Sequence, residues 1–349
     1  MADPDDLMPL HDSHSSDVID LHEPQPRDNR FNFPDGDVTI LVTSEDGEII
    51  KGKVFSHAML LAGQHWKSFI TPPQSEGEPI ELDHLEDDPS ALLFILNIVH
   101  WQPDKNPKAV SFDTLFNIAI LCDNYVCLHV VGPSVQDLNS EWLEDPAVMN
   151  QEMREKALYI AFVFGREDTF RRIAEHMVLV ASLNADGTLR AHDESLDLYP
   201  LPDDILSKRD HCIAKLLALS RSIIKGFRDP VTIQCRSGNK KCDQTILTEL
   251  LKRLEMLGLD FLPEDKASDT VCSPSLLAGR LSRIKIGIPP TSVLGSQEDH
   301  SRCGVSYEEQ VNKIILNDIE DPTDDNFVGQ MEYRRRALDG AGLLWTDYS

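Results

Sequence analysis

The sequence predicts an α+β protein with a small α/β domain near the N-terminus, an all-helical C-terminal region after it, and disordered acidic tails at both ends. Two patterns predict this fold class. Two β-type runs separated by a turn lie near residue 40, and the apolar residues of most later segments recur with helical spacing. Hydrophobic residues make up 41% of the 349 residues, which suits two domains, or one domain with a helical extension.

The two ends of the chain have a different composition from the middle. Residues 1–30 contain eight acidic residues and two arginines among scattered Pro, Ser and His. Such a segment cannot bury enough apolar surface to fold, so we expect a disordered acidic tail there. Residues 318–349 are also acidic and irregular in pattern, and we expect a second tail. Order is expected to begin near Phe31.

The first domain opens with a predicted β-hairpin. Asp37–Thr43 and Glu48–Phe55 are rich in β-branched residues, and Asp46-Gly47 lies between them. An Asp-Gly pair between two such runs favours a tight turn. Ser56 follows at once and can cap a short helix over Ser56–Ala62.

A proline-rich loop follows, and after it a short strand is expected at Pro79–Asp83. Asp88-Pro89-Ser90 then begins a strongly apolar helix. Ser306-Tyr-Glu-Glu309 has the pattern of a capping box and predicts a helix near the C-terminus. The helix that Asp88 begins is expected over Ala91–His100, and the other expected helices are Ser111–Tyr125, Glu152–Phe164, Asp168–Ala181, Asp203–Lys225 and Asp243–Leu257.

Three stretches of the first domain resemble the BTB/POZ domain of fungal proteins. They are DVTILV from Asp37, VFSHAMLLAGQHWKSF from Val54 and FDTLFNIAILCDNYVC from Phe112. The family has a strand that begins Asp-Val, a helix of comparable pattern after it, and a later helix that ends near a Tyr and a Cys. The resemblance implies a BTB/POZ-like domain over residues 31–132, followed by a helical C-terminal region over residues 133–317.

The resemblance implies a non-catalytic protein–protein interaction module that forms a homodimer and binds further protein partners. Dimer contacts in the family lie around the first strand and the first helix. Alternating Val and Ile in a strand, or Leu on a helix, is also typical of a core, so each matching side chain is either core or interface. The matching positions here are Val38, Ile40, Met59, Leu60 and Trp66.

Two other functions remain open for a protein of this kind. The chain could be the substrate adaptor of a cullin ubiquitin ligase, with the domain holding the cullin scaffold and the helical region holding the substrate. Cullin-binding members carry a hydrophobic-x-Glu element where this chain has Phe69-Ile70-Thr71. The chain could instead be a nuclear transcriptional cofactor that partner proteins recruit.

Four residues of the C-terminal region suit a structural zinc site. Cys235 and Cys242 flank a turn-like basic loop, and His300 and Cys303 follow as a His-x-x-Cys pair. Together they supply four soft ligands. The six-residue gap between the first two cysteines is wider than the common Cys-x₂₋₄-Cys spacing, so free or buried cysteines are the competing interpretation. No other cofactor is expected.

Composition and motifs disfavour several other classes of protein. The 33 Lys+Arg and 59 Asp+Glu give a net charge of −26, which disfavours direct binding to nucleic acid or to anionic membrane. The longest apolar stretch, Ala91–Val99, is too short to span a bilayer. Seven scattered cysteines and the absence of an Asn-x-Ser/Thr sequence favour the cytoplasm or the nucleus. With neither a glycine-rich phosphate loop nor a Gly-x-Ser-x-Gly elbow, we predict no catalytic residue.

Overall fold

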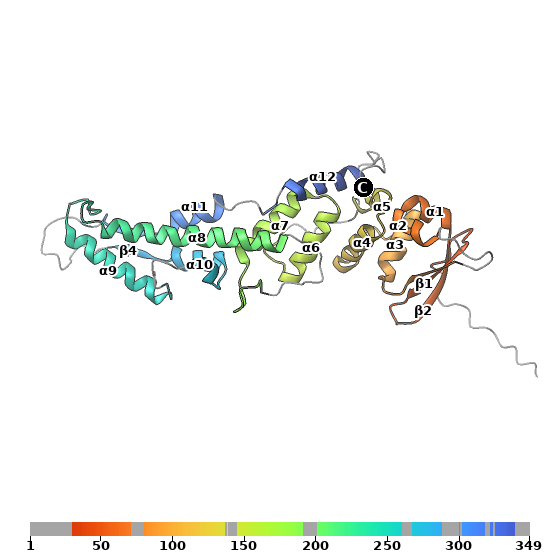
Figure 1. Ribbon diagram of the computed structural model, residues 1–349, viewed down its shortest axis with the longest axis horizontal. Coiled ribbons are helices and arrows are strands. Elements are labelled where there is room, and N and C mark those ends of the chain that lie inside the picture. The colour runs from red at the N-terminus through yellow and green to blue at the C-terminus, as the bar shows by residue number, and fades with distance from the viewer. Residues whose placement is uncertain are drawn as a thin grey trace, which may run out of the picture.

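The chain is elongated in the computed structural model, with a small sheet and its covering helices at one end and a long helix running towards the other (Figure 1). Apart from Arg30, the expected N-terminal tail lies outside the described residues. The structure describes residues 30–70, 80–136, 138, 145–190, 201–259, 267–287, 300, 302–317, 322–323 and 325–338.

Three strands form the sheet of the N-terminal unit, which we define as residues 30–136. They are β1 (Val38–Thr43), β2 (Ile49–Val54) and β3 (Glu81–His84). The central strand β1 is antiparallel to β2 and parallel to β3, so the strand order is β2-β1-β3. The predicted hairpin and the predicted short strand are therefore both present.

Five helices complete the N-terminal unit. Asp88 caps the third by accepting a hydrogen bond from the Ala91 N–H (2.8 Å), as its sequence pattern predicts. Sequence analysis predicted neither the second nor the fifth. Pro133 lies inside the fifth, and proline usually interrupts a helix. The five are α1 (Ser56–Ala62), α2 (Gln64–Ile70), α3 (Pro89–Val99), α4 (Phe112–Asn124) and α5 (Leu128–Gln136).

The start of α1 differs from the predicted cap. Ser56 is the first helical residue, and Phe55 before it offers no capping side chain. The carboxylate of Asp37, just before β1, instead accepts hydrogen bonds from the Ser56 N–H (2.7 Å) and the Ser56 hydroxyl (2.6 Å). Burial raises the pKa of Asp37, but these hydrogen bonds outweigh it and the pKa is lowered. A charged group thus joins the first strand to the first helix.

The rest of the chain is mostly helical, and every predicted helix is present. It also contains a two-stranded antiparallel sheet, β4 (Lys285–Gly287) and β5 (Gly304–Ser306), which corrects the expectation of an all-helical region. Strands of three residues are too short to show a period of two in the sequence. The helices are α6 (Gln151–Val163), α7 (Glu167–Val180), α8 (Leu201–Arg228), α9 (Lys240–Met256), α10 (Pro274–Ser282), α11 (Glu308–Asn317) and α12 (Asp325–Leu338), and short 3₁₀ turns lie at Pro103–Lys105 and Ala267–Asp269.

Buried apolar residues form two cores. The first core fills the N-terminal unit, continues over α6, α7 and α12, and reaches Ile205 at the start of α8. The second core begins at Cys212 on α8 and lies among α9, α10, α11 and β4. The change from one core to the other therefore lies within α8, whereas the expected domain boundary after residue 132 falls inside α5. No helix among the described residues is both long and apolar enough to cross a membrane.

A buried arginine lies where the two cores meet. Arg209 on α8 has no exposed surface. Its guanidinium donates hydrogen bonds to the backbone carbonyls of Ala181 (3.2 Å), after α7, and Cys272 (3.0 Å), before α10. A buried charge is costly unless it is fully paired, so these bonds fix α8 against both neighbours.

Helix α12 corrects the expectation of an irregular acidic tail from residue 318. It packs on α5, α6 and α7, which lie far from it in the sequence. Arg334 forms an ion pair with Asp123 (2.7 Å) and lies 4.5 Å from the centre of the Phe162 ring. Phe327 packs against the rings of Phe162 and Phe170. The acidic composition of the segment concealed these widely spaced apolar contacts.

The substitution Gly165→Ala tests the docking of α12. Gly165 has a φ of +57°, and a Cβ atom there would lie 2.6 Å from the Met331 carbonyl oxygen. Gly187 is the matched control because its φ is +87° and nothing lies within 4 Å of its Cβ position. We expect Gly187→Ala to cost about 1 kcal/mol of unfolding free energy through backbone strain. Gly165→Ala should cost about 2 kcal/mol more by displacing α12. Urea unfolding measures both, and equal losses would contradict the docking.

Candidate metal centre

Three separate stretches of chain bring four side chains together at one point in the second core. Cys235 lies in the loop between α8 and α9, and Cys242 lies in the first turn of α9. His300 and Cys303 lie just before β5. All four are buried, and one ligand atom from each lies within 4.8 Å of the others. These are the four residues that sequence analysis identified as metal ligands.

The distances between the ligand atoms suit a tetrahedral metal site. Cys235 Sγ lies 3.7 Å from Cys303 Sγ and 3.5 Å from His300 Nδ1. Cys303 Sγ lies 3.8 Å from His300 Nδ1. Tetrahedral zinc with bonds of the usual length places two sulfurs about 3.8 Å apart, and a sulfur and a nitrogen about 3.6 Å apart. The cluster could therefore hold a metal such as zinc through four protein ligands.

A tight turn and a helix cap account for the unusual gap between the first two cysteines. The Gly238 N–H donates to the Cys235 carbonyl (2.9 Å), and Gly238 has a φ of +67°, a conformation that glycine adopts without strain. The Asn239 side chain then caps α9 by accepting a hydrogen bond from the Lys241 N–H (3.0 Å). The six intervening residues thus turn the chain back so that both thiols face the same point.

The environment shifts the pKa values of the two thiols in opposite directions. Burial raises the pKa of Cys235, but backbone N–H groups of Asn239 and Ser237 and the neighbouring thiols outweigh it, so the pKa is lowered. Burial and the thiols of Cys235 and Cys303 raise the pKa of Cys242 well above its usual range. A bound cation would instead lower the pKa of Cys242, because a thiol that coordinates a metal is deprotonated outright.

The second half of the site is held by the β4–β5 ladder. The Cys303 N–H donates to the His300 carbonyl (2.9 Å), which closes a turn between these two ligands. Gly304 follows directly and opens β5. A Cβ atom at Gly304 would lie 2.3 Å from the Ile286 carbonyl oxygen, so only glycine allows β5 to approach β4 this closely.

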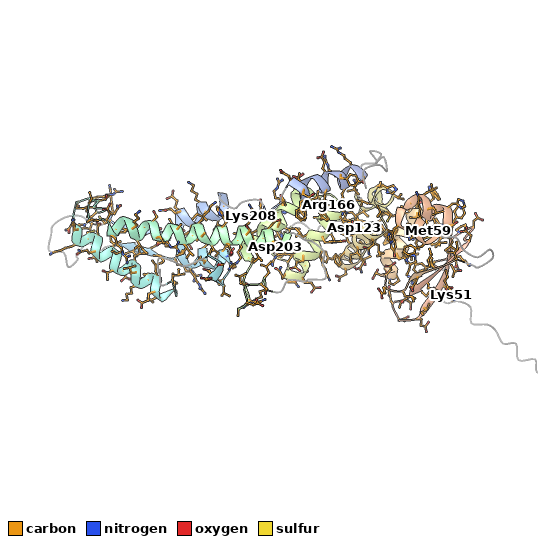
Figure 2. The ribbon with its side chains drawn as sticks, in the orientation of Figure 1. Lys51, Met59, Asp123, Arg166, Asp203 and Lys208 are labelled. Carbon is orange, nitrogen blue, oxygen red and sulfur yellow. The ribbon has the colours of Figure 1, made fainter. Side chains whose placement is uncertain are left out.

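Four of the five expected interface residues lie inside the chain. Val38, Ile40, Met59 and Trp66 are at most 1% exposed, and Figure 2 shows Met59 within the N-terminal unit. Trp66 stacks on Tyr125 with ring centres 4.9 Å apart. Their burial favours the core interpretation of these four positions, because a side chain with almost no exposed surface offers little area to a second copy. Leu60 is half-buried.

Sequence analysis missed the groups that support the ligands. They include the Asn239 cap and Gly304, and both had a signal in the sequence. A Ser-Gly-Asn run, typical of turns, follows Cys235, and a glycine directly follows the last ligand. No protein-family model, curated protein or solved structure matches this chain.

Cys303→Ser tests the cluster as a metal site, with Cys272→Ser as its control. Cys272 is a free thiol beside the second core but outside the cluster. We expect the unaltered chain and Cys272→Ser to retain about one metal ion each after dialysis, because four ligands hold it. Cys303→Ser should bind metal at least about 100-fold more weakly, because one ligand is lost. Metal analysis by mass spectrometry measures the content, and equal content in both variants would contradict the site.

Proposed function

We propose that this chain is a non-catalytic protein-interaction protein of the BTB/POZ kind that self-associates through its N-terminal unit. The observation that carries this proposal is the order β1, β2, α1, α2, β3, α3 together with the β2-β1-β3 sheet. It agrees with the order of hairpin, helix, short strand and helix that the sequence predicts for the first domain. Self-association would give the protein two copies of every other binding surface, which strengthens binding to a partner with repeated sites.

Zinc is the metal proposed for the Cys₃His cluster. Three thiolates and an imidazole are soft or borderline ligands, which suit zinc better than calcium or magnesium. All four ligands come from the protein and all are buried, as in structural zinc sites. The proposed role of the metal is to fold the far end of the molecule, where it joins the α8–α9 loop to the β4–β5 ladder.

The proposed self-association surface lies beside Leu60 and uses exposed apolar side chains. Leu61 is 69% exposed, Phe69 is 50% exposed and Val126 is 39% exposed. The His65 ring contacts Phe69, and His65 borders the same hollow as Val126. His129 also borders this hollow and forms a hydrogen bond with the Leu61 backbone. Exposed apolar residues that cluster in this way favour a protein contact.

The two-core arrangement favours the adaptor as a second candidate function. Helix α8 has 28 residues and is about 42 Å long, so the N-terminal unit and the second core lie well apart (Figure 1). A protein that holds a scaffold at one end and a substrate at the other needs such a separation. An adaptor of this kind should co-purify with a cullin from cell extract, whereas a plain self-associating scaffold should not.

Leu61→Asp tests the self-association surface, and Leu316→Asp is the control. Leu316 on α11 is 78% exposed, so both substitutions place a charge on a similarly exposed leucine. Light scattering after size-exclusion chromatography in about 1 M salt, which screens contacts between exposed charges, should give the mass of two chains for the unaltered protein and for Leu316→Asp. Leu61→Asp should give the mass of one chain, because a buried unpaired carboxylate is costly at an interface.

Circular dichroism should be unchanged in both variants, because neither leucine belongs to a core. A Leu61→Asp protein that keeps the mass of two chains would contradict the proposed surface. An unaltered protein with the mass of one chain at every concentration would contradict self-association itself.

A further inference from the structure

Charge is distributed unevenly along this acidic chain. Residues 207–316, which include the second core, contain 17 Lys+Arg and 13 Asp+Glu, a net charge of +4. The rest of the chain contains the other 16 Lys+Arg and 46 Asp+Glu, a net charge of −30. The far end of the molecule is therefore locally cationic and attracts anionic groups, although the whole chain is acidic.

Six exposed cations lie around the metal centre, and we call them the basic face. They come from the end of α8, the loop that contains Cys235, the start of α9 and the loop before β5, at the end of the molecule opposite the sheet (Figure 1). Asp229 is the only acidic residue in the run 221–242. The basic face consists of Lys225, Arg228, Arg236, Lys240, Lys241 and Arg302.

A hollow of about 500 Å³ opens between these elements. Arg236 and Arg302 line it, together with Gln310 from α11, and no ion pair in the described part of the chain involves either arginine. Asp243 also lines the hollow, but its Oδ2 accepts the Gln234 N–H (2.8 Å) and is tied to the ligand loop. Two guanidinium groups without an acidic partner suit a ligand with carboxylates, which arginine binds through paired hydrogen bonds.

We infer that the basic face binds the acidic segment 1–30 of a second copy of this chain. The charges are complementary, because that segment carries eight acidic residues and two arginines against the six cations of the face. The segment leads directly into Phe31, whose carbonyl accepts a hydrogen bond from the Lys53 N–H of β2 (3.0 Å), whereas the basic face lies at the end opposite the sheet (Figure 1). The contact would therefore join copies head to tail, unlike the proposed contact between N-terminal units. This inference deepens the proposed function and rests on it, since it names a second surface of self-association.

Fluorescence anisotropy of a labelled peptide of residues 1–30 tests the inference. The peptide is titrated with the full chain, with the double variant Arg236→Glu/Arg302→Glu, and with the control Lys252→Glu/Arg283→Glu. The control cations are exposed but lie outside the hollow, on α9 and after α10. We expect the first pair of substitutions to weaken binding about tenfold or more, and the control pair about twofold or less.

Further titrations distinguish the acidic peptide from other ligands of the basic face. Raising the salt from about 50 to 200 mM should weaken peptide binding, because salt screens surface charges. A peptide with its eight acids changed to amides should not bind. Equal binding to both double variants would overturn the inference, and so would binding of a single-stranded oligonucleotide at this face with no binding of the peptide.

Two more measurements separate this inference from related outcomes. A full chain whose own eight acids in residues 1–30 are changed to amides should bind the peptide as the unaltered chain does. Suppose that the peptide binds the chain with the eight amides but not the unaltered chain. The basic face is then covered by the segment of its own chain, and the inferred contact between copies is overturned. The Leu61→Asp chain should also bind the peptide. The self-association surface that contains Leu61 and the basic face are therefore tested independently.

Discussion

The convergence of three thiols and an imidazole is the constraint on which the far end of this molecule depends. The loop between α8 and α9 has little other means of packing, since Val231 is 86% exposed and Ile233 is 37% exposed. Without a cation the buried cluster disfavours charged thiols, because burial and the neighbouring thiols raise the pKa of Cys242. A shared metal turns the same cluster into a source of folding free energy. This loop also presents Arg236, so the order of the proposed basic face depends on the metal site.

Helix α8 connects the two ends of the molecule, because it belongs to both cores. Its first residues complete the core that begins at the sheet, and its later residues complete the core that contains the metal ligands. Arg209 ties the helix at the change from one core to the other, and α12 returns along the outside to close the first core. The sheet and the Cys₃His cluster thus lie at opposite ends of an elongated molecule, a separation that the proposed adaptor function requires.

Local chemistry decided what could be predicted from the sequence. The hairpin follows from Asp46-Gly47, and the four candidate metal ligands follow from residue types that together suit a soft cation, so both were predicted without knowledge of the fold. Which face of a helix meets a neighbour is a tertiary property, and the contact between Trp66 and Tyr125 spans 59 positions. The five interface positions therefore came from resemblance, and the burial of four of them agrees with the core, the other interpretation of the same pattern. The β4–β5 pairing and the docking of α12 were missed. Strands of three residues and widely spaced apolar residues show no clear periodicity in the sequence.

X-ray absorption at the zinc edge of the purified full chain is the most direct test of the central claim, that the cluster is a structural zinc site. The account predicts about one zinc per chain, with three sulfur neighbours near 2.3 Å and one nitrogen neighbour near 2.0 Å. No open position is expected, so no oxygen neighbour should be observed. A chain without bound metal, or one whose zinc has only nitrogen and oxygen neighbours, would contradict the account.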